Sequence, residues 1–202
     1  MEASGLTDTA RRSEPHRVLL KQVASKTELP STVLQDAEAI LEKAICASLH
    51  KGRAAAAIVA SSLILASNKN GAGLSPDEVA VAVRSTEYSV VARDVQKTIR
   101  SMAQELKMGP EYVYSKPVSY VHRILDRLGI DDEGFEKEVL RLVSSLDRLK
   151  FQGYNPLSIA GASIYIAGRE KGLSQRDVAK CCFVSRVTLR NATKRVQESL
   201  GQ

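Results

Sequence analysis

The chain has 202 residues, enough for one large domain or for two small domains with a core each. Its 44 % hydrophobic and 26 % charged residues are typical of a soluble globular protein, and its net charge of +6 suits a polyanionic partner. The longest apolar run, residues 54–66, is too short to span a bilayer, and no secretory signal is visible, so we expect neither a membrane partner nor secretion.

The sequence repeats itself at a distance of about one hundred residues. Ile58-Val-Ala-Ser-Ser-Leu-Ile-Leu-Ala matches Ile159-Ala-Gly-Ala-Ser-Ile-Tyr-Ile-Ala, 101 residues later. Leu74-Ser-Pro-Asp-Glu-Val-Ala then matches Leu173-Ser-Gln-Arg-Asp-Val-Ala. Because this period exceeds the roughly 20–50 residues of a solenoid unit, it predicts two tandem domains with a common fold.

Each copy is predicted to contain five helices and no strand, because no run of β-branched residues alternates with a period of two. In the first copy the predicted helices cover residues 12–27, 31–50, 53–68, 75–83 and 87–107. In the second copy they cover residues 117–128, 132–150, 156–170, 174–181 and 185–200. The predicted organisation is a flexible N-terminal segment (1–11), a first repeat (12–107), a linker (108–117) and a second repeat (118–202).

The third and fourth helices of the two copies share particular features. The third helix carries mainly Ala, Ser, Gly and Ile around its whole circumference, which is typical of a helix enclosed by its neighbours. The fourth helix begins with a capping sequence in each copy. Ser75-Pro-Asp-Glu78 is a capping box with proline at the first helical position, and the segment from Ser174 to Asp177 is a weaker version of it.

The last thirty residues, 173–202, are typical of a helix-turn-helix, in which a longer second helix enters the DNA major groove. A short helix is followed by the turn Cys-Cys-Phe-Val and by a basic helix, and no acidic residue occurs between Asp177 and Glu198. Ser185 is the predicted N-cap of the second helix. The free amides and the dipole at that end favour a DNA phosphate.

The second helix has two predicted faces. At about 100° per residue, one stripe packs inward, and it consists of Leu189, Ala192, Val196 and Leu200. A second face lies roughly a third of a turn away and gathers Arg186, Val187, Arg190 and Lys194. The alternative interpretation is a solvated basic face on an ordinary surface helix.

The three cysteines, Cys46, Cys181 and Cys182, predict no disulfide framework, because their number is odd and the adjacent pair has unfavourable geometry. The odd number points to a reducing compartment. No Cys-x-x-Cys or His-x-x-x-His spacing is present, so we expect no zinc or other metal site and no cofactor. We interpret the cysteines as small core residues.

Two five-helix units, each with a small-residue central helix followed by Leu-Ser-x-x-[Asp/Glu]-Val-Ala, resemble cyclin-type folds. The details are similar to the core of transcription factor IIB and of its archaeal counterpart, transcription factor B. The matching segments are Lys51-Gly-Arg-Ala54, Tyr114 to Ile130, Asn155 to Ala167 and Val184-Ser-Arg-Val-Thr-Leu-Arg-Asn191. The resemblance implies an all-α fold of two tandem five-helix cyclin-like domains, the second ending in the helix-turn-helix.

The resemblance also implies a general transcription initiation factor. Cores of this family bind the TATA-binding protein on bent promoter DNA, contact double-stranded DNA on both sides of the TATA element and position RNA polymerase. We expect the same partners here, and a monomeric chain. The family's zinc ribbon and polymerase-reaching segment are not found, which predicts a core fragment or a truncated relative. The divergent first repeat and the cysteines favour a eukaryote and hence the nucleus, with the archaeal cytoplasm as the alternative.

Site residues follow from the resemblance. In the family, the second-repeat recognition helix reads an upstream element through an apolar residue and an Arg three positions later, and these correspond to Val187 and Arg190. An arginine can bind guanine O6 and N7, and a valine can contact a thymine methyl group. Contacts with DNA phosphates are expected from Lys180, Ser185, Arg186, Thr188, Lys194 and Arg195.

In the first repeat, the corresponding helix also has basic residues: Arg93, Lys97, Arg100 and Lys107. They are expected to meet DNA phosphates or the acidic edge of the TATA-binding protein. The alternative is a solvated surface interleaved with Asp94 and Glu105. Glu87, near the predicted start of this helix, argues against major-groove reading by the first copy.

Two other classes of function compete with an initiation factor. A cyclin-like kinase regulator or other protein-interaction scaffold without DNA binding shares the fold, but it does not require the acid-free basic run. An enzyme is the second alternative. His16, His50 and His122 lie in no Gly-rich elbow, phosphate loop or metal-ligand spacing, so we predict that the protein is not an enzyme.

Overall fold

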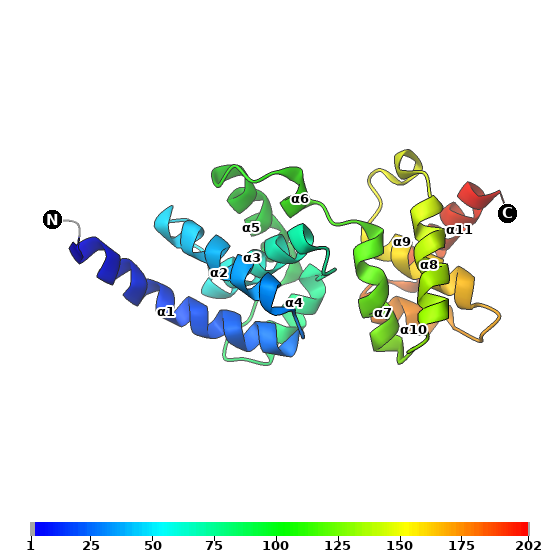
Figure 1. Cartoon of the computed structure of the whole chain (residues 1–202), viewed down its shortest axis with the longest axis horizontal. Coiled ribbons are helices and arrows are strands. Elements are labelled where there is room, and N and C mark those ends of the chain that lie inside the picture. Colours follow the sequence, from blue (N-terminus) through cyan, green and yellow to red (C-terminus); the bar gives the residue numbers. More distant parts are fainter. Residues whose placement is uncertain (1–2, 202) are drawn as a thin grey trace. The chain divides into compact units, whose positions relative to one another are not determined.

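The computed structural model describes the backbone of residues 3–201 and the side chains of residues 14–147 and 150–201. This part of the chain consists of helices and connecting turns and contains no strand, so the predicted all-α class is confirmed (Figure 1). The chain divides into two compact units, Met1–Ser115 (unit 1) and Lys116–Gln202 (unit 2). None of the described helices combines the length and the apolar character needed to cross a membrane.

Unit 1 is built around a central helix. Its elements are α1 (Ala3–Lys26), α2 (Ser31–Cys46), α3 (Ala55–Asn70), α4 (Pro76–Arg84), α5 (Ala92–Glu105) and the single turn α6 (Pro110–Val113). All five other helices pack against α3, which is buried without interruption from Ala56 to Ser67. A helix can be buried on every side only when each of its residues is apolar or small, and α3 meets this requirement.

Unit 2 repeats the arrangement around α9. Its elements are η1 (Pro117–Tyr120), α7 (Val121–Leu128), α8 (Glu133–Ser145), η2 (Arg148–Phe151), α9 (Pro156–Gly168), α10 (Gln175–Cys181) and α11 (Arg186–Leu200). Helices α7, α8, α10 and α11 pack against α9. The prediction of an enclosed third helix is confirmed for α3 and for the part of α9 from Leu157 to Ile164, whereas residues 165–167 are half-buried.

One buried hydroxyl in each of the two central helices is satisfied in the same way. Ser62 Oγ donates to the carbonyl of Ile58 at 3.0 Å, and Ser163 Oγ donates to the carbonyl of Ile159 at 3.0 Å. A buried hydroxyl without a partner would be destabilising, and a bond to the residue four positions earlier satisfies it inside the helix. Serine is therefore compatible with complete burial here.

The predicted caps of the fourth helices are confirmed. Ser75 Oγ accepts a hydrogen bond from the amide of Glu78 at 3.2 Å, and Pro76 occupies the first turn of α4. Ser174 Oγ accepts from the amide of Asp177 at 3.2 Å at the start of α10. These bonds fix where α4 and α10 begin.

Helix α5 begins at Ala92, so its predicted start at residue 87 is wrong. The hydroxyls of Ser85 and Thr86 donate to carbonyls in the last turn of α4, each at 2.6 Å, and the amide of Tyr88 donates to Thr86 Oγ1. Local bonds of this kind compete with a helical backbone. Glu87 therefore lies in the turn between the helices, and the predicted place for it near the start of α5 is wrong as well.

Other helix ends also differ from the predicted ones. Helix α1 begins at Ala3, so the segment predicted to be flexible is helical from Ala3 onward. Helix α2 ends at Cys46. Two residues later, Ser48 adopts a left-handed φ of 59°, which terminates the helix. Helix α8 ends at Ser145 because the next residue is extended.

Helices α9, α10 and α11 meet at Gly161. A Cβ atom at this position would lie 2.5 Å from Cys182 Sγ and 3.2 Å from Leu189 Cδ1. Both neighbours are fully buried, so neither side chain can move into free space. Glycine is required here for close approach of the helix-turn-helix.

We expect Gly161→Ala to lower the free energy of unfolding by about 1–3 kcal/mol, because overpacking outweighs the better helix propensity of alanine. Urea denaturation followed by circular dichroism measures this change. Adding Cys182→Ala should recover part of the loss by removing the clashing sulfur. A Gly161→Ala variant as stable as the parent, or more stable, would show that the contact is loose.

Candidate nucleic-acid interface

Helices α10 and α11 form a helix-turn-helix with an unusual turn residue. The amide of Phe183 donates to the carbonyl of Lys180 at 3.2 Å, and the amide of Val184 donates to the carbonyl of Ala179 at 3.1 Å. Phe183 has a left-handed φ of 51°, a conformation that favours glycine, and its side chain is 39 % exposed. A contact with a neighbouring element would stabilise this residue in the turn.

Arg127 on α7 supplies that contact. Its Nη1 donates to the carbonyl of Cys181 at 3.0 Å, and its guanidinium carbon lies 5.0 Å from the centroid of the Phe183 ring. Cys181 Sγ donates back to the carbonyl of Arg127 at 3.5 Å. These contacts tie the turn to α7 and fix the direction in which α11 begins. The sequence gives no signal for this role, because the partners lie 54 residues apart.

The predicted N-cap of α11 is confirmed. Ser185 Oγ accepts from the amide of Thr188 at 3.0 Å and lies 2.8 Å from Thr188 Oγ1. The hydroxyls of both residues therefore already serve the first turn of the helix. The remaining amides of that turn and the positive end of the helix dipole favour an anion there.

A buried stripe anchors α11 in unit 2, as the sequence predicts. Leu189, Ala192 and Val196 are buried, and Leu200 packs against the same core. Thr193 is buried beside them, and its hydroxyl donates to the carbonyl of Leu189 at 2.9 Å. The opposite face of α11 is left for solvent or a partner.

That opposite face is what we call the reading face: Arg186, Val187, Arg190, Asn191 and Lys194. All five side chains are exposed, and Val187 is 56 % exposed despite being apolar. They are spaced three or four residues apart and so lie beside one another on the helix. None of them bonds to another side chain in the part of the molecule that the structure describes.

The reading face unites four of the predicted residues, Arg186, Val187, Arg190 and Lys194. Asn191 is a further member that the sequence analysis does not single out. Its place four residues after Val187 and three before Lys194 is the signal that could have identified it. An asparagine can bind adenine N6 and N7, which makes it a candidate for base contact.

The other predicted phosphate contacts are less closely grouped. Lys180 is exposed at the last turn of α10. Arg195 lies at the edge of the reading face, where its Nη1 forms an exposed ion pair with Glu198 at 3.3 Å. A phosphate would have to compete with this carboxylate, so Arg195 is less available than Lys194.

Helix α5 presents a basic row in unit 1. Arg93, Lys97 and Arg100 are exposed and spaced four and three residues apart, so they follow one line along the helix. Asp94 and Glu105 fall about 100–120° around the helix from this row. The row itself therefore contains no acid. Lys107 lies beyond the end of α5 in a left-handed conformation and is not part of it.

The two fifth helices correspond position by position, 94 residues apart. The N-caps Val91 and Ser185 correspond, and so do the buried residues Val95 and Leu189. By this correspondence the row of Arg93, Lys97 and Arg100 occupies the places of Val187, Asn191 and Lys194. Unit 1 thus has only cations where unit 2 combines an apolar, an amide and a cationic side chain.

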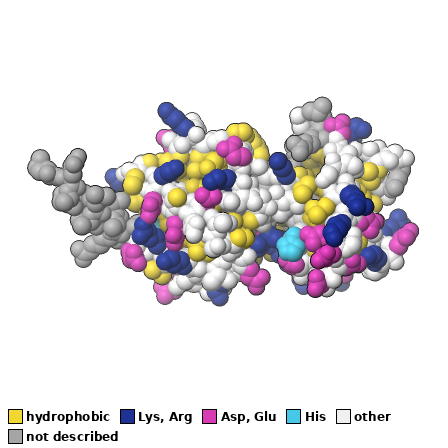
Figure 2. Space-filling view, in the orientation of Figure 1, with side chains coloured by type: hydrophobic (Ala, Val, Ile, Leu, Met, Phe, Trp, Pro, Cys, Tyr) yellow, Lys and Arg dark blue, Asp and Glu magenta, His cyan; other side chains and the backbone are white. Residues whose placement is uncertain are grey.

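The visible face of the molecule carries charges of both signs. On the face shown in Figure 2, Lys and Arg side chains alternate with Asp and Glu over both units, with small hydrophobic patches between them. Such mixed surfaces are ordinary for soluble proteins. The reading face differs because cations, an amide and an exposed valine gather there without an acid between Arg186 and Lys194.

Comparison with known proteins points to one family. Residues 11–104 match the model of the transcription factor TFIIB repeat. The chain is 29 % identical to transcription initiation factor IIB of Aeropyrum pernix over its full length, and 31 % identical to that of Archaeoglobus fulgidus over 90 % of its length. These matches support a core domain of the transcription factor IIB family. The chain is thus related to initiation factors and not to enzymes, as the sequence predicts.

The chain spans about three fifths of the Aeropyrum relative and about half of the Archaeoglobus relative, 62 % and 54 % of their lengths. A relative from Methanocaldococcus jannaschii is 31 % identical over 90 % of the chain, which covers 26 % of that longer protein. These relatives are archaeal, which is compatible with the archaeal alternative and gives the nuclear expectation no support.

The cysteines lie in three different environments. Cys182 is buried, as predicted, and burial raises the pKa of its thiol to about 12. Cys181 is half-buried, and burial raises its pKa as well. Cys46 is exposed at the end of α2, so its assignment to the core is wrong. That position falls on the outer side of α2, which a residue type alone does not reveal.

We expect iodoacetamide at pH 8 to alkylate Cys46 rapidly and to leave Cys182 unmodified in the folded protein, because the buried thiol is almost entirely protonated. Mass spectrometry of tryptic peptides measures both sites. In urea the two should react at similar rates. Rapid labelling of Cys182 without denaturant would mean that α10 opens frequently.

Proposed function

We propose that the chain is the core of a general transcription initiation factor, which binds the TATA-binding protein on promoter DNA and helps to recruit and position RNA polymerase. The observation that carries the proposal is the reading face of α11, exposed and free of internal partners on a helix anchored by its buried stripe. The printed names of the relatives, transcription initiation factor IIB, support the same function.

Each member of the reading face has a distinct task in this proposal. Arg190 binds guanine through two parallel hydrogen bonds, Val187 contacts a thymine methyl group, and Asn191 suits adenine. Arg186 and Lys194, with Lys180, bind phosphates on either side and set the register of the helix in the groove. The basic row of α5 binds a second phosphate backbone or an acidic surface of the TATA-binding protein.

The alternative function is a cyclin-like interaction module without DNA binding. A kinase regulator has no use for an exposed apolar residue surrounded by cations on a helix-turn-helix. We propose that the chain acts as a monomer. The archaeal cytoplasm is the location that the relatives favour.

We expect DNA binding that depends on salt and on the TATA-binding protein. With the three phosphate contacts of Lys180, Arg186 and Lys194, the logarithm of the binding constant should fall with the logarithm of salt concentration with a slope of about −3. Gel shifts on promoter and scrambled DNA, with and without the TATA-binding protein, measure both dependences. Binding that is insensitive to salt, or equally tight without the partner, would contradict the proposal.

The sharpest expectation separates base reading from positioning. Arg190→Ala should cost about 1–3 kcal/mol of binding free energy on the preferred site and flatten the preference at one base pair. Lys194→Ala should weaken binding to all sequences alike and lower the salt slope by about one. Val187→Ala should have a smaller, site-dependent effect.

Arg195→Ala is the matched control, since Arg195 is a nearby arginine on the same helix that is paired with Glu198. It should change affinity much less than Arg190→Ala. Titrations on a small library of upstream sequences distinguish these outcomes. If Arg190→Ala keeps the parent's ranking of sites, α11 positions the protein but reads no base there.

A further inference from the structure

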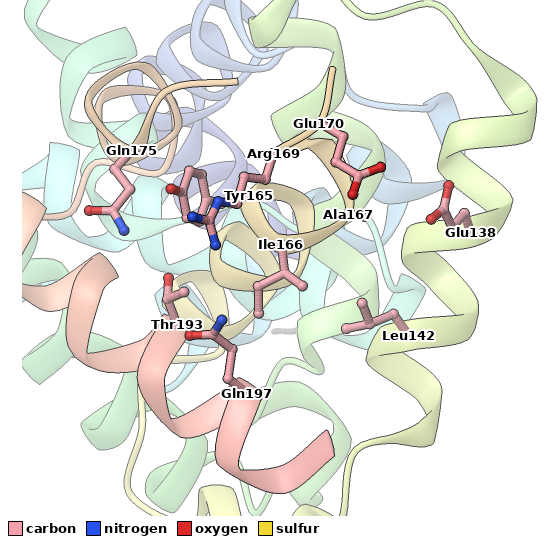
Figure 3. A pocket seen from close by; sticks show the side chains of 10 residues that line it. All are labelled: Glu138, Leu142, Tyr165, Ile166, Ala167, Arg169, Glu170, Gln175, Thr193 and Gln197. Carbon is pink, nitrogen blue, oxygen red and sulfur yellow. The ribbon is translucent and has the colours of Figure 1, made fainter. Parts of the chain in front are cut away.

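Unit 2 has a groove of about 610 Å³ between α8, α9 and α11 (Figure 3). Leu142 and Ile166 give it an apolar lining, and both are only half-buried. Its charged residues are Glu138, Arg169 and Glu170, all exposed. In Figure 3 the two glutamates lie on one side of the groove, and Arg169 lies apart from them beside Tyr165. None of the three charges has an ion-pair partner among the described residues.

The corresponding place in unit 1 is occupied by α6. This turn packs against α3 and α5, and Tyr112 and Val113 lie against the core. Asn68 Nδ2 donates to the carbonyl of Tyr112 at 2.8 Å. Lys69 Nζ lies 5.8 Å from the centroid of the Tyr112 ring and 3.0 Å from Asp36 Oδ2. The described part of unit 2 has no segment in the place of α6.

The correspondence of the two sites rests on caps and burial. Helices α3 and α9 match 101 residues apart, with Gly71 and Gly172 both left-handed after them. Helices α2 and α8 match 102 residues apart, from their N-caps Pro30 and Asp132 onward. The buried residues of these two helices agree with this register: Val33 and Phe135, Ala37 and Val139, Leu41 and Val143.

The charges at the corresponding positions differ between the units. Asn68 corresponds to Arg169, Lys69 to Glu170, and Asp36 to Glu138. Where unit 1 has an aspartate neutralised by a lysine, unit 2 has two carboxylates with no cation between them. Two carboxylates in one groove repel each other and favour a cation brought by a partner. Arg169 has the donors to bind backbone carbonyls, as Asn68 does.

We propose that the groove of unit 2 binds a short protein segment in the manner of α6, one that carries an aromatic residue and a neighbouring lysine or arginine. The aromatic ring packs on Leu142 and Ile166, the cation lies between Glu138 and Glu170, and Arg169 donates to the carbonyls of the segment. The two carboxylates repel phosphate, so a nucleic acid does not suit this groove. The proposal does not depend on DNA binding, because α11 lines the groove with Thr193 and Gln197, which lie outside the reading face.

Two synthetic peptides test the proposal. The parent peptide has the sequence of residues 108–115, Met-Gly-Pro-Glu-Tyr-Val-Tyr-Ser, and the lysine peptide replaces its glutamate by lysine. Titration into the whole isotope-labelled chain, followed by amide chemical shifts, measures binding. We expect the lysine peptide to shift amides around Ile166, Arg169 and Gln197 and to bind at least about fivefold more tightly than the parent.

Glu170→Lys should abolish this preference, because the new lysine can pair with Glu138 as Lys69 pairs with Asp36 in unit 1. Glu133→Lys is the matched control, since Glu133 is an exposed glutamate of α8 that pairs with Lys137 and does not line the groove. It should leave the preference unchanged. Glu170 is exposed, so the variant is expected to fold, and its amide spectrum verifies this.

Three outcomes would overturn the proposal: no shift in the groove with either peptide, equal binding of both peptides, or an equal effect of Glu133→Lys. Self-association of the chain that Glu170→Lys abolishes would assign the groove to a second copy and would also overturn it. DNA gel shifts with Glu170→Gln should match the parent. A failure of the peptide experiment therefore leaves the proposed DNA binding standing, and the reverse also holds.

Discussion

Enclosure of one helix by the others is the constraint on which each unit depends. Because α3 is covered on all sides and α9 over most of its length, their buried residues are small or apolar, and their buried serines form hydrogen bonds with nearby backbone groups. Close packing then limits the neighbours as well, as the contact of Gly161 with Cys182 and Leu189 shows. The fold is stabilised mainly by aliphatic burial, in agreement with a composition that contains no Trp and three Phe.

This constraint acts on the buried residues of each unit and leaves the exposed residues of the outer helices free to vary. An outer helix such as α11 needs only one buried stripe to remain in place, so its other positions are free to change. The fifth helices show the result: Arg93 and Lys97 occupy the places of Val187 and Asn191 on closely similar buried stripes. A row of cations suits a phosphate backbone or an acidic protein surface, whereas valine with asparagine and arginine suits base edges. The same arrangement of buried helices thus carries a purely cationic face on α5 and a mixed apolar, amide and cationic face on α11.

Features that depend on neighbouring residues could be predicted from the sequence. The repeat, the caps Ser75, Ser174 and Ser185, and the buried stripe of α11 all follow from local spacing. The start of α5 could not, because two hydroxyl bonds near Ser85 decide it against the helical pattern. Contacts between residues far apart in the sequence could not be predicted either, above all those of Arg127 with Cys181 and Phe183 in the turn. Of the candidate site, the reading face was foreseen except for Asn191, whereas the groove of unit 2 was not.

The comparison of the two repeats adds information that neither repeat gives alone. In unit 1, Lys69 and Asp36 form an ion pair, so each charge is neutralised within the unit. The corresponding Glu170 and Glu138 are both negatively charged, and no described cation lies between them. Their charges are therefore not neutralised within unit 2. Folding alone gives no reason to place like charges together, because exposed pairs of opposite sign are at least as favourable. The two units share one arrangement of buried helices, but only unit 1 neutralises the charges at this position. This difference supports the proposal that a partner supplies the missing cation in the groove of unit 2.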